Sequence, residues 1–312
     1  MKQGAVLDIE GQRRSSKFED RGRGGRGGLG GLPINALFSV VRLLGVKGAA
    51  VVAMLGAGVF FLAPAGMKQA LLRAVAGGSE ASGPSTAGTG SACQASPDNS
   101  KACDFSRAVL ASTEDVWTKQ FNHGTLPSYG SSPGQYQEPT LVVFSEAVGT
   151  GGCGNASSAM GPFYCPGDRK LYIDPTFYEV MKHRLNAPGD FAQAYVIAHE
   201  VGHHIQNLIG ATTLQPTGET KNQVSVRVEL QADCLAGVWG HSAKLSLKIT
   251  DEDLKEAVNA AHAIGDDALG NSNASDYTHG SSAQRIRWFR RGFDQGDPGH
   301  CDTFAVTKYA EL

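Results

Sequence analysis

The stretch that decides the fold reads A-H-E-V-G-H-H and covers Ala198–His204. Apolar residues around it recur at helical spacing, which predicts a largely buried helix over residues 191–209. On a helix, His199 and His203 project from the same face about one turn apart. Two imidazoles at that separation can bind one Zn²⁺. Glu200 stands beside them, where its carboxylate can take a proton from a water that the metal activates.

A catalytic zinc site needs a third protein ligand and one open position. The extended pattern H-E-x-x-H-x-x-G-x-x-H is not met, because Gln206 and Ile209 stand where a glycine and a third histidine are required. A later stretch, V-E-L-Q-A-D, places Glu229 and Asp233 in an apolar helical context. We therefore expect Glu229 as the third ligand. Asp233, on the same helix face, would accept the second ring N–H of a ligand histidine; the alternative is that both are solvated carboxylates.

Hydrolysis of a peptide also needs a group that stabilises the developing oxyanion. His279 lies in Y-T-H-G-S-S, a predicted loop just before the last helix, from which its side chain can turn into a cleft. We therefore expect His279 to be catalytic. Tyr277 and Arg285 are alternatives, and a purely structural role of His279 in the loop stays open.

An apolar segment earlier in the chain sets the predicted compartment. Residues 48–66 contain no charged side chain and approach the length that a bilayer core requires. Lysine and arginine are more frequent before this segment than just after it, which by the positive-inside rule keeps the N-terminus in the cytoplasm and exports the rest. A single transmembrane anchor is expected over residues 37–66. A cleaved signal peptide and a buried core helix are the alternatives.

All six cysteines follow the apolar segment, which agrees with export to an oxidising compartment. Six cysteines leave the pairing open. Pairing of neighbours along the chain would give the disulfides Cys93–Cys103, Cys153–Cys165 and Cys234–Cys301. Free buried thiols are the alternative, and ligation of a metal by cysteine is disfavoured because the chain has no C-x-x-C pair.

Four regions are expected along the chain: a cytoplasmic Gly/Arg-rich tail (1–36), the transmembrane anchor (37–66), a flexible linker (67–100) and the folded domain (101–312). Helical periodicity dominates the domain, and short β-branched runs precede the motif helix. The predicted fold class is α+β, a mainly helical zincin-like domain with a small β-sheet, preceded by one transmembrane helix. A formal net charge of −2 gives no electrostatic preference for nucleic acid, which is not expected as a partner.

The motifs together resemble the bacterial neutral zinc metallopeptidases. The resemblance rests on H-E-V-G-H-H, R-V-E-L-Q-A-D-C-L-A-G-V-W, G-P-F-Y-C-P and T-H-G-S-S-A-Q-R, and on the layout of tail, anchor and domain. Through H-E-x-x-H and a Glu-x-x-x-Asp on the next helix, the family is similar to gluzincins such as thermolysin. The resemblance implies zinc on His199, His203 and Glu229. It also implies Glu200 as the base and Asp233 as a hydrogen-bond partner of a ligand.

The predicted function is zinc-dependent hydrolysis of peptide bonds by a metal-activated water, in a membrane-anchored domain facing the periplasm or the cell exterior. A peptide or protein is the expected substrate. It could add to a strand edge beside the site, for which the stretch closed by a Cys153–Cys165 disulfide is the candidate; the alternative is that this stretch is a structural loop merely held closed. The alternative is a non-catalytic zinc-binding scaffold or assembly factor of the envelope, which would not need Glu200. Hydrolysis of a non-peptide amide stays open as well.

Overall fold

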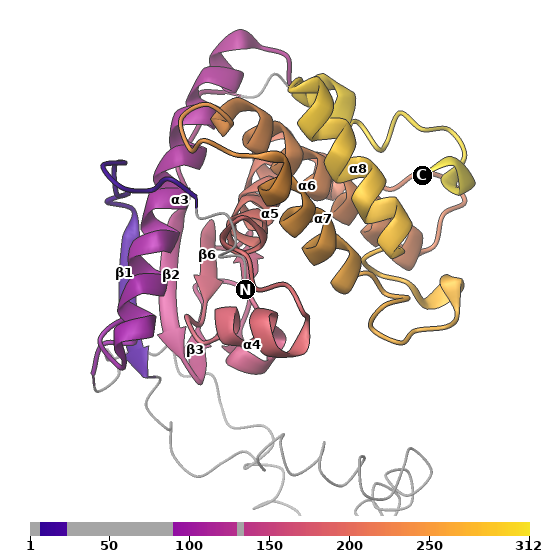
Figure 1. Ribbon diagram of the computed structural model, residues 1–312. Helices are drawn as coiled ribbons and strands as arrows, with labels where there is room; N and C mark the ends of the chain where they lie inside the picture. Colours follow the sequence, from indigo (N-terminus) through magenta and orange to yellow (C-terminus); the bar gives the residue numbers. More distant parts are fainter. Residues whose placement is uncertain (1–6, 24–89, 130–133) are drawn as a thin grey trace, which may run out of the picture. The chain divides into compact units, whose positions relative to one another are not determined.

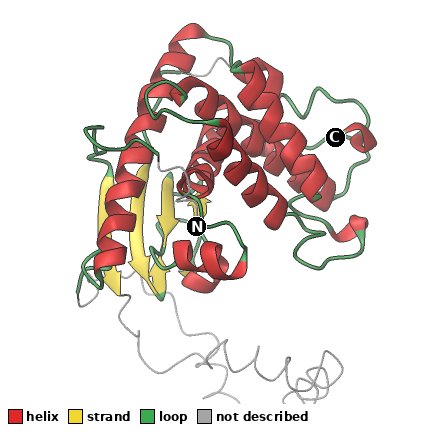
Figure 2. Cartoon of the chain, viewed as in Figure 1, coloured by secondary structure: helices red, strands yellow, loops and turns green. Residues whose placement is uncertain are grey.

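The structure is a computed structural model, and it describes residues 7–23, 90–129 and 134–312. Within these ranges a small mixed sheet packs against a larger set of helices (Figures 1 and 2). The strands of the sheet, in order across it, are β1 (Phe18–Arg23), β2 (Thr140–Ser145), β6 (Lys170–Ile173) and β5 (Phe163–Cys165). β1, β2 and β6 run parallel, and β5 is antiparallel to β6. The expected combination of many helices with a small sheet is therefore observed.

β2 shows how the sheet is built into the core. Its sequence T-L-V-V-F-S is almost wholly apolar because both of its faces are covered. Side chains alternate between the two faces of a strand. Leu141 and Val143 accordingly join the main core, whereas Val142 and Phe144 pack into a second apolar cluster. That cluster includes residues of a hairpin, formed by β3 (Ala147–Gly149) and β4 (Asn155–Ser157).

Four of the six α-helices in the described part of the chain begin at side chains that satisfy their first backbone N–H groups. The helices are α3 (Pro97–His123), α4 (Phe177–Arg184), α5 (Asp190–Ile209), α6 (Lys221–Ala243), α7 (Asp251–Ala263) and α8 (Ser282–Gln295). Ser96 caps α3, and Thr220, Thr250 and Ser281 each form a capping box at α6, α7 and α8. α5 carries the A-H-E-V-G-H-H stretch and ends at Gly210, which has a left-handed φ of 82°.

Two glycines allow α6 and α8 to approach closely. A Cβ atom on Gly292 would lie 1.9 Å from the carbonyl oxygen of Cys234, and one on Gly237 would lie 2.1 Å from that of Phe289. No side chain tolerates such separations, so the contact depends on glycine at both positions. As a result, the first turns of α8 lie close enough to donate hydrogen bonds to a carboxylate on α6.

The N-terminal residues belong to the folded unit. β1 pairs in parallel with β2, Leu7 and Ser15 are buried, and Arg14 forms an ion pair with Asp104 on α3. We expected this part of the chain to lie in a separate polar tail. Residues 7–23 instead form one compact unit with the domain that follows.

The predicted transmembrane anchor needs correction. Among the residues that the structure describes, no helix combines the length and the apolar character needed to cross a bilayer, and the span expected over residues 37–66 lies outside them. The pairing of β1 with β2 gives a physical reason against the single-pass topology. One crossing between these strands would put them on opposite sides of a membrane, yet their backbones are hydrogen-bonded in one sheet. The fold class with a preceding transmembrane helix and the single-pass localisation are therefore wrong.

Candidate metal centre

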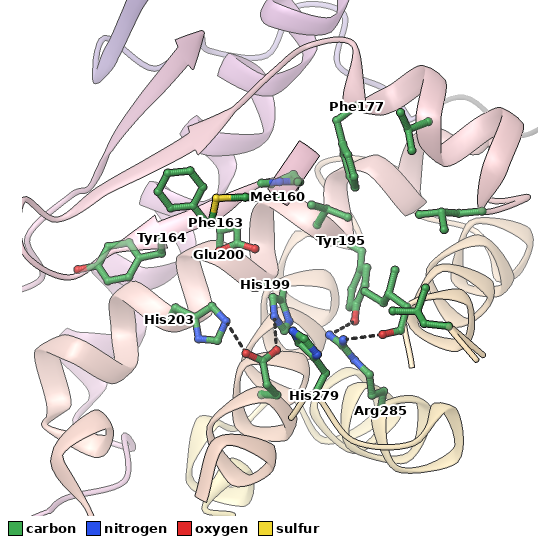
Figure 3. Close-up of a pocket in the computed structure, with 18 of the residues that line it drawn as sticks. Met160, Phe163, Tyr164, Phe177, Tyr195, His199, Glu200, His203, His279 and Arg285 are labelled. Atoms are coloured by element: carbon green, nitrogen blue, oxygen red, sulfur yellow. Dashed lines mark hydrogen bonds and ion pairs between the residues drawn. The ribbon is translucent and has the colours of Figure 1, made fainter. Parts of the chain in front are cut away.

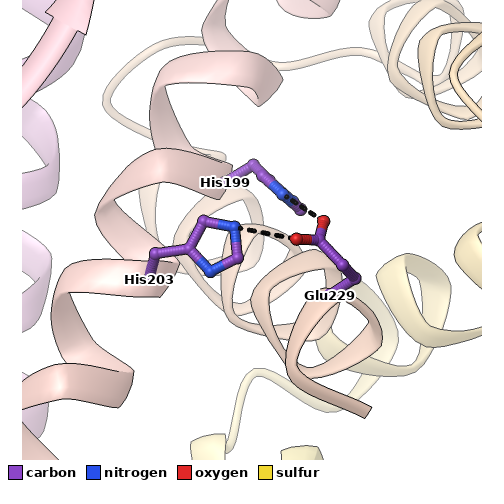
Figure 4. A group of neighbouring side chains, drawn as sticks. All are labelled: His199, His203 and Glu229. Carbon is purple, nitrogen blue, oxygen red and sulfur yellow. Dashed lines mark hydrogen bonds and ion pairs between the residues drawn. The ribbon is translucent and has the colours of Figure 1, made fainter. Parts of the chain in front are cut away.

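α5 and α6 bring His199, His203 and Glu229 together (Figure 4). The Nε2 atom of His199 lies 3.2 Å from Oε2 of Glu229, and Nε2 of His203 lies 3.5 Å from Oε1 of the same carboxylate. One ligand atom from each residue lies within 4.8 Å of the other two. Zinc–ligand bonds of about 2.0–2.2 Å in a tetrahedron separate neighbouring ligand atoms by about 3.3–3.6 Å. The three side chains therefore fit the coordination of a zinc ion.

Gly202 explains how the two helices come close enough. It lies between the two histidines on α5, and a Cβ atom there would lie 3.0 Å from both Cα and the carbonyl oxygen of Ala232 on α6. A larger residue would push α6 away from α5. Because Glu229 lies one turn before Ala232, this push would withdraw its carboxylate from the histidines.

Asp233 contacts the ring of His199 on the side opposite to Glu229. Its Oδ1 atom lies 2.8 Å from Nδ1 of His199, and the carboxylate also accepts hydrogen bonds from the Tyr195 hydroxyl at 2.5 Å and from Nε and Nη2 of Arg285, both at 2.9 Å. All four side chains are buried. With Nδ1–H donating to Asp233, the Nε2 lone pair of His199 is directed to the ligand group. Arg285, one of the alternatives for the oxyanion group, already donates hydrogen bonds to Asp233, to Tyr195 and to a backbone carbonyl.

The ionisable side chains of this group shift one another's pKa values toward the charged forms. Burial raises the pKa of Asp233, but Arg285 and His199 outweigh burial and hold that pKa below its ordinary value. For Glu229, burial is likewise outweighed by His203 and His199, so that its pKa is also lowered. Burial lowers the pKa of His199, yet Asp233 and Glu229 raise it to about 10. A metal ion that binds here must displace the proton of His199.

Gln206 positions His203. In the sequence, Gln206 stands out only as a residue that breaks the extended zinc motif. Its Oε1 atom lies 2.8 Å from Nδ1 of His203. Its Nε2 atom donates to the carbonyl of Val228 at 2.6 Å and to Oε1 of Gln231 at 3.1 Å. Gln231 in turn donates to the hydroxyl of Tyr129 at 2.7 Å. The position three residues after a ligand on the same helix face was the signal that could have identified Gln206.

Glu200 lines a cavity of about 690 Å³ together with the three metal-binding side chains (Figure 3). The residue is only 9% exposed, and it is one of the residues that line this cavity. In Figure 3 it lies between the His199–His203 pair and the aromatic ring of Phe163. A carboxylate so placed can exchange protons with a molecule at the metal centre.

His279 also lines the cavity, on the loop that precedes α8. Asp266 holds this loop, because its Oδ2 atom accepts the backbone N–H groups of Thr278, His279 and Gly280 at 2.8–3.0 Å. Its Oδ1 atom lies 3.2 Å from Nδ1 of His279. The imidazole is half exposed, with 49% of its side chain accessible. Tyr277, the other alternative, is not among the residues that line the cavity.

Three disulfides close the described part of the domain. They are Cys93–Cys103, Cys153–Cys165 and Cys234–Cys301, which confirms the pairing of neighbours along the chain. Disulfides of this number fit an exported protein. Cys234 directly follows Asp233 on α6, so its disulfide ties the metal-binding helix to the C-terminal segment.

The chain belongs to the family described as “Putative neutral zinc metallopeptidase”, which it matches over residues 7–304. One relative is the uncharacterized protein YpfJ of Escherichia coli (strain K12), 50% identical over 220 residues, which are 67% of this chain and 74% of the relative. Another is the uncharacterized protein Rv2575 of Mycobacterium tuberculosis (strain H37Rv), 44% identical over 188 residues, 55% of this chain and 64% of the relative. No solved structure is significantly similar to the chain.

Proposed function

We propose that this protein hydrolyses peptide bonds with a zinc ion held by His199, His203 and Glu229. The observation that carries the proposal is the meeting of these side chains, at 3.2 and 3.5 Å, beside Glu200 in one cavity. Membership of the zinc metallopeptidase family supports the same reaction. Zinc bound there would lower the pKa of a water to about 7 and polarise the carbonyl of the substrate.

The protein's own side chains transfer the proton, orient the ligands and stabilise the oxyanion. Glu200 accepts the proton of the attacking water and passes it to the leaving nitrogen. Asp233 and Gln206 keep the two imidazoles in the tautomer and orientation that binding requires. His279 donates a hydrogen bond to the developing oxyanion from its Nε2 atom when it is protonated, because Asp266 already accepts from Nδ1.

The sheet edge beside the cavity supports a peptide as the substrate. β5 is the last strand of the described sheet, and its residues Phe163 and Tyr164 line the cavity. The Tyr164 hydroxyl accepts a hydrogen bond from Asn207 at 3.0 Å and lies 3.1 Å from Nδ1 of His204, both on α5. The edge is thus held next to the metal-binding helix. An extended peptide can add to such an edge through backbone hydrogen bonds.

The proposal is tested with a Glu200→Gln variant. Wild-type protein should contain one zinc per chain and cleave a denatured-protein mixture, with the activity abolished by a chelator and restored by zinc. Glu200→Gln should keep its zinc but lose activity by roughly 10²- to 10⁴-fold, since only the proton transfer is removed. His183→Ala, which changes an exposed histidine of α4, is the matched control and should behave as wild type. Full activity of Glu200→Gln, or an inactive zinc-loaded wild type, would favour the scaffold alternative.

A further inference from the structure

Outside the candidate metal centre, the wall of the cavity is largely apolar. Six large side chains from separate segments form much of it: Met160, Phe163, Phe177, Val180, Leu185 and Leu269. Met160 comes from the short helical turn before β5, and Phe163 comes from β5 itself. Phe177, Val180 and Leu185 come from α4 and its end, and Leu269 comes from the turns after α7. In Figure 3, Met160 and Phe163 lie beside Glu200, and Phe177 faces the same space from above.

Two of these side chains are unusually exposed. Met160 is 68% and Leu269 is 58% accessible. In the described part of the chain, the only other large hydrophobic residue exposed to this degree is Leu245, at 92%, and it does not line the cavity. A single exposed apolar residue needs no explanation, but two at the rim of one apolar cavity indicate a surface that a ligand covers.

The carboxylates and the arginine of the cavity belong to the metal centre or to the hydrogen bonds around it. Among the described residues that line it, the carboxylates are Glu200 and Glu229, which belong to the metal centre, and the one arginine is Arg285, whose side chain is 2% exposed and bonded to Asp233. No lysine lines it. Apart from His279, which is assigned to the oxyanion, no charged side chain of the cavity is left to pair with a charged chain end or side chain of a substrate, whose burial would therefore be costly.

We infer that the site cleaves within polypeptide chains, next to a bulky apolar side chain that is buried between Met160 and Leu269. This inference rests on the proposed peptidase function and names its substrate class. The cavity of about 690 Å³ is large enough for side chains on more than one residue of a bound peptide. Burial of a leucine or phenylalanine side chain in place of alanine should raise kcat/KM by about 10- to 100-fold.

The test uses the full-length zinc-loaded protein and peptides with blocked ends that differ at one position beside the cleaved bond. Peptides with leucine or phenylalanine there should be cleaved about 10- to 100-fold more efficiently than those with alanine, glutamate or lysine. Leu269→Glu and Met160→Glu should each lower kcat/KM for the leucine peptide by about 10-fold and improve the lysine peptide relative to it. Leu245→Glu, an equally exposed leucine outside the cavity, is the matched control and should leave both values unchanged.

Peptide binding to the zinc-loaded Glu200→Gln variant, measured by calorimetry, separates the two proposals. Tighter binding of the leucine peptide than of the alanine peptide supports the apolar cavity, even if no peptide is cleaved and the peptidase function fails. Equal binding of the two peptides, or a requirement for a free amino or carboxyl end, would overturn the inference. A fall in leucine-peptide cleavage with Leu245→Glu as large as that with Leu269→Glu would also overturn it.

Discussion

Replacement of Gln206 by leucine should weaken zinc binding although no ligand is removed. The Gln206 side chain is fully buried and bridges His203 to the carbonyl of Val228 and to Gln231. Leucine has a similar volume but neither donates nor accepts, so that the ring N–H of His203 loses its partner. Loss of such an outer hydrogen bond typically costs 10- to 100-fold in metal affinity, which corresponds to about 1.4–2.7 kcal/mol.

The same change should also lower the free energy of unfolding. It leaves the Val228 carbonyl and one amide oxygen of Gln231 without the donor that Gln206 supplies, in addition to the His203 ring. Each buried group left without a partner costs about 1–3 kcal/mol. The Val228 carbonyl keeps its hydrogen bond within α6, so the groups left without a partner are the His203 ring and the Gln231 amide oxygen. We therefore expect a loss of about 2 kcal/mol or more, measured by denaturant unfolding of the metal-free protein.

A Gln206→Glu variant separates the two effects. Its carboxylate keeps an oxygen for Nδ1 of His203, so zinc affinity should stay within about threefold of wild type. It cannot donate to the Gln231 amide oxygen, so the free energy of unfolding should still fall. Zinc dissociation constants are measured by competition with a chromogenic chelator at fixed pH, and Gln295→Leu, at an exposed glutamine of α8, is the control. If Gln206→Leu binds zinc as tightly as wild type, His203 does not depend on Gln206 and the reasoning is refuted.

Three further changes test other parts of the structure. Arg285→Met should lower the free energy of unfolding by about 3–5 kcal/mol in urea titrations, because it leaves the Asp233 carboxylate buried without its cation. Gly292→Ala should give insoluble or strongly destabilised protein in expression and thermal melting, because its Cβ atom would lie 1.9 Å from the Cys234 carbonyl oxygen. Burial, outweighing a backbone hydrogen bond, raises the pKa of Glu256 from 4.5 to about 7, so this group contributes stability below pH 4.5 that is lost as the pH rises to about 7. Glu256→Gln should remove that part of the pH dependence in urea unfolding, and an unchanged pH profile would contradict the assignment.

That His199 and His203 lie together could be predicted because their signal is local. His199 and His203 lie four apart on one helix, and helical geometry alone places them on one face. Glu229 was harder to predict as a ligand, since it lies on another helix, but its apolar surroundings indicated that its carboxylate is buried. The close contact at Gly202 that brings this helix near belongs to the packing, and the sequence shows only that a glycine is present there.

Gln206 and Asp266 could not be assigned from the sequence because their roles depend on residues far along the chain. Gln206 acquires its role only when Val228 and Gln231 pack against it. Nothing around Asp266 in the sequence indicates a role at the site. Its carboxylate binds three successive N–H groups of the loop that carries His279, and only the folded chain brings the two segments together.

β1 was missed for a related reason, and it decides the topology. Its sequence F-E-D-R-G-R lacks the apolar alternation of a strand, because it lies at the edge of the sheet with most of its side chains accessible. Charge counting before and after an apolar segment cannot detect a parallel pairing between residues more than one hundred positions apart. The strand is further tied to the residues that follow the apolar segment. Asp20 accepts hydrogen bonds from the backbone N–H groups of Ala92 and Cys93 at 2.9 and 3.1 Å and from the hydroxyl of Ser91.

These contacts bring β1 and Ser91–Cys93 together at one carboxylate. The backbone N–H groups and the Ser91 hydroxyl outweigh the effect of burial and hold the pKa of Asp20 below its ordinary value, so the junction stays ionised at neutral pH. The described residues on either side of 24–89 therefore belong to one folded unit. The cysteine pair Cys93–Cys103 begins directly after this junction. The conditions that allow this disulfide to form therefore apply to β1 as well, and the N-terminal strand shares its compartment with the metal centre.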